Sequence, residues 1–223
     1  MKKVFVLWSG GLDSTFLVEK NLADGNDVTV GYVRIGNNVQ KSKKELDAIN
    51  KMCDYFNCHY SGHLYNIGII SEFTINQSNT NLVLCQLPVW INSLLYIDDR
   101  YDEIQIGYTM NDDAISYIPD ILSIYNSYES IMRRPLAPLT FPLMKQKKAD
   151  TIFLISDEIR KMVVFCEDEY SDFCGTCHSC KRMIDAIQEC KEWYGRDFSG
   201  VYPFMDKTIQ KEFDFSPSIS IVS

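Results

Sequence analysis

The sequence predicts an α/β fold in which an open, mainly parallel β-sheet is flanked by helices. Two observations support this class. Apolar, β-branched runs alternate along the chain with amphipathic runs of helical spacing, and this alternation is typical of βαβ units. The first such unit also joins its strand to its helix through adjacent glycines, a composition that favours a tight turn. The 223 residues suit one domain with a small appendage.

The first unit begins almost at Met1. Residues 4–8, Val-Phe-Val-Leu-Trp, form an apolar run expected to be a buried parallel strand. Ser9, Gly10 and Gly11 stop that strand, because glycine is poorly tolerated in strands and favoured in turns. Asp13 or Ser14 is the expected N-cap of an amphipathic helix that ends near Gly25.

The remaining elements follow in alternation. Strands are predicted at 27–33, 58–65, 103–108 and 139–141, and helices at 40–56, 82–97, 115–132 and 149–159. Pro88 must start, kink or break the helix at 82–97. In open parallel sheets, ligands bind beyond the carboxyl ends of the strands. Residues 9–14, 34–38 and 108–113 are therefore expected to converge there.

The glycine turn between the first strand and helix is a candidate phosphate site. Such a turn directs free backbone N–H groups of Gly10, Gly11 and Leu12 toward a ligand at the positive end of a helix. Ser9 and Ser14 add hydroxyl donors. The alternative is an ordinary βα loop in which the glycines serve only the turn.

Composition and charge favour a small-molecule substrate. The net charge of −8 argues against a broad electrostatic hold on nucleic acid, which needs a basic face. No run approaches the roughly 20 apolar residues of a membrane span, and no signal peptide precedes Val4. We therefore expect a cytoplasmic protein without a membrane or nucleic-acid partner.

The eight cysteines are unevenly spaced. Cys53, Cys58, Cys85 and Cys190 are isolated and are expected to be small buried apolar residues. The others are crowded: Cys166, Cys174, Cys177 and Cys180. Four thiolates with such spacers can surround one tetrahedral Zn²⁺, and His178, at the expected start of a helix, ranks below them as a ligand. An iron–sulfur cluster and a redox-active cysteine pair are the alternatives.

The string Ser-Gly-Gly-Leu-Asp-Ser at 9–14 resembles the pyrophosphate loop (PP-loop) of the ATP pyrophosphatases, which implies a Rossmann-like, adenine nucleotide α-hydrolase fold. With the cysteine cluster, it resembles the 7-cyano-7-deazaguanine synthase (QueC) family. Pro142-Leu143-Met144 and the later Lys148 are similar to a Pro-Leu segment and lysine of that family, and Gly107 also fits.

The resemblance implies a reaction. ATP would adenylate 7-carboxy-7-deazaguanine, ammonia would give the amide, and a second ATP would give the nitrile. It implies Ser9, Asp13, Ser14 and Lys148 as catalytic residues, and residues 9–14 with Tyr32 and Gly107 as nucleotide-binding residues. Mg²⁺ would be held by Asp13, or by Asp112 or Asp113. Residues 1–160 would bind the nucleotide and 161–223 would be a zinc-binding segment packed on them; residues 204–223 could add a strand or a homodimer contact.

Two segments depart from that family. The chain reads Val-Arg-Ile-Gly-Asn-Asn at 33–38, where the family has Gln-Arg-His, and only Asn-Leu-Val at 81–83 is similar to the family's Pro-Gly-Arg-Asn element. Three alternatives therefore stay open: adenylation of another carboxylate or arrest at the amide, thiolation of tRNA by a PP-loop enzyme, and a nucleotide-binding module without catalysis.

Overall fold

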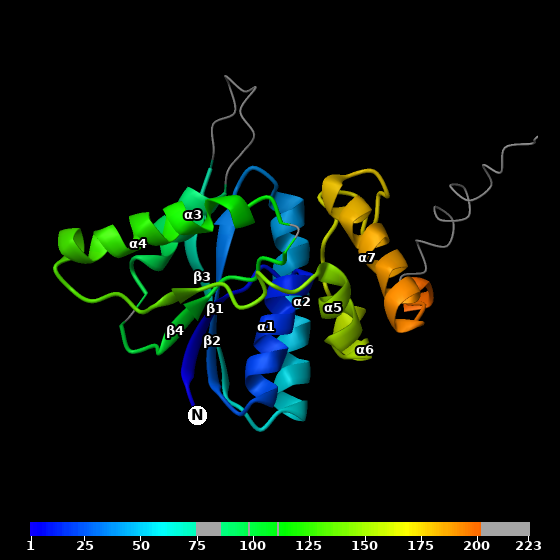
Figure 1. The fold of residues 1–223 in the computed structure, drawn as a ribbon, viewed down its shortest axis with the longest axis horizontal. Coiled ribbons are helices and arrows are strands. Elements are labelled where there is room, and N and C mark those ends of the chain that lie inside the picture. Colours follow the sequence, from blue (N-terminus) through cyan, green and yellow to red (C-terminus); the bar gives the residue numbers. More distant parts are fainter. Residues whose placement is uncertain (75–85, 98, 111, 202–223) are drawn as a thin grey trace, which may run out of the picture.

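A computed structural model of the chain describes residues 1–74, 86–97, 99–110 and 112–201 (Figure 1). Five strands form one parallel sheet in the order β3-β2-β1-β4-β5. They are β1 (Lys3–Leu7), β2 (Asp27–Ile35), β3 (Leu64–Phe73), β4 (Glu103–Gln105) and β5 (Leu139–Thr140). The predicted fold class, an open parallel sheet flanked by helices, is confirmed.

Helices cover both faces of the sheet (Figure 1). On one side lie α1 (Leu12–Ala23) and α2 (Val39–His59), and on the other α3 (Leu87–Leu94) and α4 (Ile118–Met132). Beyond α1 follow α5 (Lys148–Leu154), α6 (Asp157–Arg160) and α7 (His178–Tyr194). Short 3-10 turns span Ile115–Tyr117 and Ser199–Val201.

Two hydrophobic cores result from the alternation of side chains along β1. Val4 and Val6 point toward α1 and α2, in a cluster that also contains Met183 of α7. Phe5 and Leu7 point the other way, toward α3 and α4. Because successive strand residues face opposite sides, β1 is buried on both faces, which explains its unbroken apolar sequence.

The strand order reverses at β1. From β1 the chain adds β2 and then β3 on one side, through α1 and α2, whereas β4 pairs with the other edge of β1. The loops after β1 and β4 therefore start side by side and lead to opposite faces. Open α/β sheets bind their ligands at the point where the strand order reverses.

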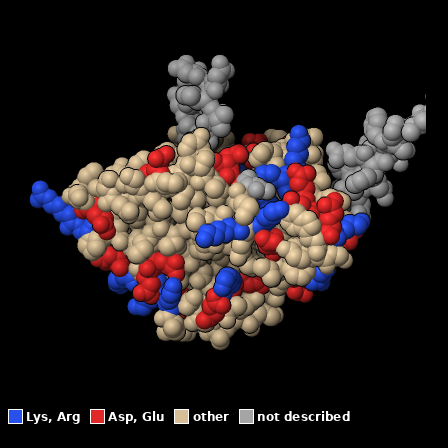
Figure 2. All heavy atoms as spheres, viewed as in Figure 1, with Lys and Arg blue, Asp and Glu red and all other residues tan. Residues whose placement is uncertain are grey.

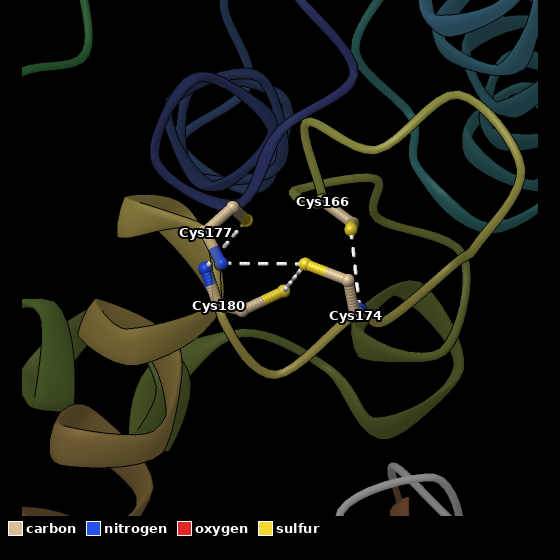
Figure 3. Close-up of side chains that lie close together, drawn as sticks. All are labelled: Cys166, Cys174, Cys177 and Cys180. Carbon is tan, nitrogen blue, oxygen red and sulfur yellow. Dashed lines mark hydrogen bonds between the residues drawn. The ribbon is translucent and has the colours of Figure 1, made fainter.

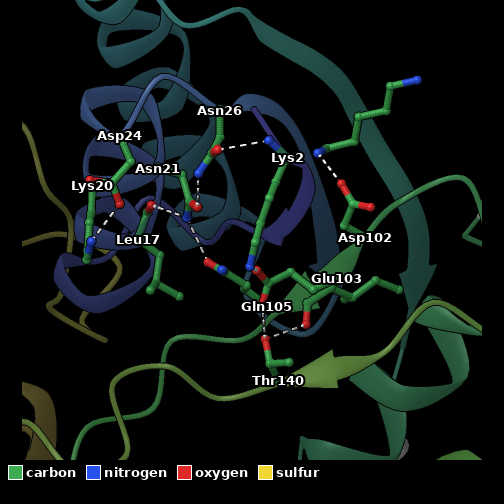
Figure 4. A network of polar contacts seen from close by, with 12 residues as sticks. Lys2, Leu17, Lys20, Asn21, Asp24, Asn26, Asp102, Glu103, Gln105 and Thr140 are labelled. Atoms are coloured by element: carbon green, nitrogen blue, oxygen red, sulfur yellow. Dashed lines mark hydrogen bonds and ion pairs between the residues drawn. The ribbon is translucent and has the colours of Figure 1, made fainter.

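A polar network ties the opposite, amino end of β1 and β4 to α1 (Figure 4). Asn21 of α1 donates to Gln105 of β4 at 2.8 Å, and Lys2 pairs with Glu103 at 3.1 Å. Burial opposes ionisation of Glu103, but the Lys2 ammonium and the Thr140 hydroxyl outweigh it and hold its pKa below the ordinary value. These contacts fix β4 against α1, and hence the two loops that leave the sheet.

The third predicted strand, 58–65, is wrong in position. Helix α2 continues to His59, with the Tyr60 N–H bonded to the Phe56 carbonyl, and β3 begins only at Leu64. The chain between them turns at Gly62, where a Cβ would lie 2.9 Å from the Asn26 carbonyl oxygen. That close approach to the α1–β2 turn sets the start of β3, and it is a tertiary contact that local periodicity does not contain.

Two helix predictions also need correction. The N-cap of α1 is Gly11, so Asp13 and Ser14 lie in the first turn instead of capping it. The predicted helix 149–159 is divided into α5 and α6, because the Ser156 N–H bonds to Glu19 and the Arg160 guanidinium binds the Ile152 and Ile155 carbonyls.

The starts of α3 and α7 agree with prediction, whereas the burial of the isolated cysteines agrees only in part. Pro88 lies in the first turn of α3 and starts it, and α7 begins at His178 as expected. Cys190 is buried as predicted, but Cys53 is half-buried and Cys58 is exposed, contrary to prediction. Cys85 and residues 204–223 lie outside the described residues. No helix in the described ranges is both long enough and apolar enough to span a bilayer.

Candidate functional site

The β1–α1 loop makes a sharp turn at the carboxyl end of β1. Gly10 has φ of +72°, and a Cβ there would lie 3.0 Å from the Glu45 carbonyl oxygen, so both conformation and space favour glycine. Gly11 then begins α1, and its extended backbone caps the helix without help from a side chain. The first N–H groups of α1 therefore remain available to an anion.

Two serine hydroxyls lie across this turn from each other. Ser9 Oγ and Ser14 Oγ are 3.1 Å apart, and Ser14 Oγ also accepts from the Ser9 N–H at 3.3 Å. Ser9 is exposed, whereas Ser14 is buried. The two predicted hydroxyl donors thus lie together at the N-terminus of α1.

Gly107, just beyond β4, packs against that N-terminus. A Cβ at Gly107 would lie 2.8 Å from the Ser14 nitrogen and 2.9 Å from the Asp13 carbonyl carbon. Any side chain would force α1 and the β4 loop apart. Gly107 therefore lets the segments after β1 and β4 meet. Convergence of these two segments was predicted from the sequence.

Lys148 and Asp13 form an ion pair beside the loop. Lys148 Nζ lies 2.5 Å from Asp13 Oδ2, and their side chains are only 17% and 13% exposed. The other carboxylate oxygen, Asp13 Oδ1, is buried and has no hydrogen-bond partner. The chain thus brings two predicted catalytic residues into contact and leaves a carboxylate oxygen free, a ligand type that suits Mg²⁺.

The loop after β4 carries the two other aspartates expected to bind Mg²⁺, and it contacts side chains that the sequence did not indicate. Asp112 accepts from Arg182 of α7 at 3.1 Å, and Asp113 lies 3.8 Å from His178. Thr109, which is fully buried, and Gln146 each have a buried side-chain oxygen without a partner. Nothing in the spacing of these residues signals their proximity, because it depends on how α7 docks. Asp112 is engaged by arginine, and Asp113 is exposed.

Tyr32 does not present a free hydroxyl toward the loop. It donates to Glu45 of α2 at 2.5 Å. Burial, reinforced by the nearby Glu45, raises the pKa of Tyr32, and burial also raises the pKa of Glu45 despite Lys41. Since the Glu45 backbone abuts Gly10, this pair supports the back of the loop.

The four crowded cysteines meet at one point (Figure 3). The Sγ atoms of Cys166, Cys174, Cys177 and Cys180 all lie within 4.8 Å of one another. A tetrahedral ion with Zn–S bonds of about 2.3 Å places its sulfurs about 3.8 Å apart, and Cys174 Sγ and Cys180 Sγ are 3.9 Å apart. A cubane cluster holds its thiolates on four separate irons, which spreads them farther. The donor set therefore fits one metal ion.

Hydrogen-bond donors favour a thiolate at Cys174, whereas burial raises the pKa of Cys166 and of Cys180. The N–H groups of Cys177 and Cys180 donate at 3.3 Å to the sulfurs three residues earlier. Hydrogen bonds from the Thr176 hydroxyl and the Cys177 N–H lower the pKa of Cys174 to about 6, whereas burial raises the pKa of Cys166. Cys177 is also the N-cap of α7, where the helix dipole favours negative charge.

The cysteine cluster lies close to the β1–α1 loop, because a residue that hydrogen-bonds to the loop is only two residues before Cys166. The Val164 N–H donates to the Gly10 carbonyl at 2.9 Å, and Cys166 lies two residues later. Beyond it, the Glu167 carbonyl accepts from Asn38, the N-cap of α2, and Glu167 Oε1 accepts from Ser179 of α7. A hollow of about 500 Å³ separates α2 from residues 161–172.

Acidic and basic side chains are interspersed over the face of the molecule that carries the C-terminal helices (Figure 2). Lys44, for example, pairs with Asp172 at 3.4 Å, and Lys191 with Asp197 at 2.9 Å. Hydrogen bonds from Ser199, with Lys191, lower the pKa of Asp197 to about 2.

Comparisons with known proteins find structural likenesses only. No protein-family model and no curated protein matches the sequence. A tRNA thiolase, NcsA, from Methanococcus maripaludis, solved with its [4Fe-4S] cluster, superposes with a TM-score of 0.49 and 16% identity; 94% of this chain and 72% of that one are covered. A predicted tRNA methyltransferase subunit from Methanocaldococcus jannaschii gives 0.33 and 14%, over 69% and 74% of the two chains.

Proposed function

We propose that the protein is an ATP-using enzyme of the PP-loop type that adenylates an acceptor and releases pyrophosphate. The observation that supports this most is the N-terminus of α1, which has no side-chain cap and lies where the strand order reverses, behind the turn at Gly10 and Gly11. In this proposal the loop of residues 9–14 binds the phosphates through backbone N–H groups and the hydroxyls of Ser9 and Ser14, with Gly107 allowing close approach.

In this proposal Asp13 binds Mg²⁺ and Lys148 binds a phosphate group. The free Asp13 Oδ1 would be a ligand of Mg²⁺, which supplies positive charge to the phosphate oxygens when bound. Lys148, now paired with Asp13 Oδ2, would then turn its ammonium toward the phosphate. Prearranged donors of this kind stabilise charge that develops as the pyrophosphate leaves.

The reaction implied by the family resemblance converts a carboxylate to a nitrile through an acyl adenylate and an amide. A carboxylate oxygen of 7-carboxy-7-deazaguanine attacks the α-phosphorus, the bond from that phosphorus to the bridging oxygen breaks, and pyrophosphate leaves. Ammonia displaces AMP and loses a proton, which gives the amide. The amide oxygen attacks the α-phosphorus of a second ATP, and a second pyrophosphate leaves. Loss of AMP and two protons from the adenylated amide then gives the nitrile. Positioning and charge stabilisation are the protein's main contributions.

The test is incubation of the protein with ATP, Mg²⁺, ammonia and 7-carboxy-7-deazaguanine, followed by mass spectrometry of the products. We expect AMP, pyrophosphate and the nitrile, and no AMP when the carboxylate is left out. An amide without nitrile would indicate that the reaction stops early. Failure to form AMP with any acceptor would refute the enzyme proposal in favour of a binding module.

Thiolation of tRNA is the second candidate. Residues 33–38 and 81–83 depart from the QueC pattern in the segments that line that family's substrate side, which favours a different acceptor. The same assay with unfractionated tRNA and sulfide, in place of the carboxylate and ammonia, would then give AMP and thiolated nucleosides. This outcome without turnover of 7-carboxy-7-deazaguanine would exclude the first reaction.

For the cysteine cluster we propose a structural Zn²⁺ that holds the segment from residue 161 against the nucleotide-binding part. The close approach of the four sulfurs supports one closed, four-coordinate ion. Elemental analysis of the purified protein should find about one zinc per chain. Stoichiometric iron and acid-labile sulfide, with the visible absorption of a cluster, would overturn zinc.

A further inference from the structure

Buried polar atoms without partners gather at the corner where the β4 loop, the start of α5 and α7 meet. Within the described residues, seven buried side-chain atoms have no hydrogen-bond partner. Four of them belong to residues on these segments or on the adjoining start of α1: Asp13 Oδ1, Thr109 Oγ1, Gln146 Oε1 and Arg182 Nη2. Because an unsatisfied buried polar atom is costly, such a concentration indicates a place built for a polar ligand.

These residues belong to segments that are bonded to one another. The Met110 N–H donates to the Gln146 carbonyl at 2.7 Å, which joins the β4 loop to the chain just before α5. Two residues later, Lys148 holds Asp13 of α1. At the other end of the β4 loop, Asp112 accepts from Arg182 of α7. The corner is therefore continuous with the N-terminus of α1.

Arg182 is the residue of this group with the most unused donor capacity. Its Nη1 donates to Asp112 Oδ2 at 3.1 Å, and Asp112 Oδ1 accepts from the Ala114 N–H at 3.2 Å, which fixes the carboxylate. Its Nη2 is buried and unpartnered. A guanidinium presents parallel donors that match the oxygens of a phosphate, and it stays charged at any working pH.

We infer that Arg182 binds a phosphate group of the nucleotide and of the pyrophosphate product, while Asp112 positions its guanidinium. This inference rests on the proposed function and extends it to a residue of the C-terminal helix. Arg182 lies two residues after Cys180, so the four-cysteine site sets where α7 begins and thus where this guanidinium lies. The metal site would in this way take part in phosphate binding without touching the phosphate.

Calorimetric titration of the full-length, metal-loaded protein with inorganic pyrophosphate and Mg²⁺ tests the inference. Loss of a charge-assisted contact in Arg182→Gln should weaken binding by about 10- to 100-fold, with Arg182→Lys in between. Lys181→Gln is the matched control, because Lys181 is the exposed neighbour on the same helix, and it should change binding by less than about twofold. Metal content and melting temperature are measured for each variant.

A second measurement needs no variant. Pyrophosphate should protect Arg182 of the wild-type protein from phenylglyoxal, as mapped by mass spectrometry. It should leave the exposed Arg133, the C-cap of α4, equally reactive. Wild-type affinity in Arg182→Gln, no pyrophosphate binding by the wild type, or unprotected Arg182 would each overturn the inference. The proposed function is tested separately, by AMP formation. If the protein forms AMP but Arg182→Gln binds pyrophosphate as tightly as the wild type, the enzyme proposal stands and the role of Arg182 does not.

Discussion

The ion pair between Asp13 and Lys148 couples the two charged side chains nearest the loop. Neither side chain is more than 17% exposed, and removing one partner of such a pair leaves an uncompensated buried charge. A pair of this kind adds little net stability by itself. Its position at the first turn of α1 therefore fits a resting arrangement that a metal ion and a phosphate would replace.

Ser14 offers the sharpest test of the loop. Ser14→Ala removes the hydroxyl that lies 3.1 Å from Ser9 Oγ, and we expect AMP formation from ATP to fall by about 100-fold or more, as for loss of one transition-state donor. The free energy of unfolding should change by only about 1 kcal/mol. Ser127→Ala, at an exposed serine of α4, is the control and should leave both unchanged. Normal turnover in Ser14→Ala would contradict the site assignment.

Glu45 predicts a pH dependence of stability. Burial raises its pKa above 4.5 in the folded protein, so the native state holds this proton more tightly than the unfolded chain. Stability is then lost as pH rises from about 4.5 through the folded pKa. Glu45→Gln keeps an acceptor for Tyr32 and avoids that loss.

We therefore expect Glu45→Gln to resemble the wild type near pH 4 and to be more stable at pH 8, measured by urea unfolding at both values. Glu158→Gln, at an exposed glutamate of α6, should track the wild type throughout. If the difference in stability between Glu45→Gln and the wild type favours the variant less at pH 8 than at pH 4, the burial argument is contradicted.

At the scale of elements, the contact between α1 and the β4 loop depends on Gly107. In Gly107→Ala the new Cβ would lie 2.8 Å from the Ser14 nitrogen, and the backbone cannot yield as a flexible side chain would. We expect a loss of about 1–3 kcal/mol in urea unfolding, as for other overpacked sites, and weaker pyrophosphate binding. Gly200→Ala is the control, since no atom lies within 4 Å of its Cβ position. Equal stability of the two variants would show that the elements can separate freely.

The elements that the sequence predicted best are those with local causes. The first strand, turn and helix combine an apolar run, two glycines and an amphipathic run, and all three appear within a few residues of prediction. The start of β3 and the division between α5 and α6 depend on contacts of Gly62 with Asn26 and of Ser156 with Glu19. Such contacts join segments distant in the sequence, so periodicity does not reveal them.

The same distinction holds for the candidate site. The four cysteines and the residues of the loop were predicted from local sequence patterns, and the structure brings each set together. The resemblance supplied Lys148, which meets Asp13. The unpartnered side chains of Arg182, Thr109 and Gln146 were not predicted individually, because a single arginine, threonine or glutamine carries no local pattern and its surroundings depend on how α7 and the β4 loop dock.

At the scale of the molecule, the C-terminal helices complete the core around α1. Met183 and Ile187 of α7 are buried in the same cluster as Leu17 of α1, and the Val164 N–H binds the loop at Gly10. Loss of the cysteine site should therefore disturb both the packing of α7 in the core around α1 and the conformation of the β1–α1 loop.

Cys177→Ser tests this dependence. Replacing one thiolate should abolish stoichiometric metal binding, measured by elemental analysis, and should lower the free energy of unfolding by about 3 kcal/mol or more, because metal binding contributes directly to folding. Pyrophosphate affinity should fall with it, since the chain at 164–166 supports Gly10. Cys58→Ser, at an exposed cysteine outside the cluster, should keep the metal, the stability and the affinity. If Cys177→Ser keeps a full complement of metal, the four-cysteine ligand set is wrong; if it loses the metal but binds pyrophosphate normally, the two sites are joined in structure without being coupled in function.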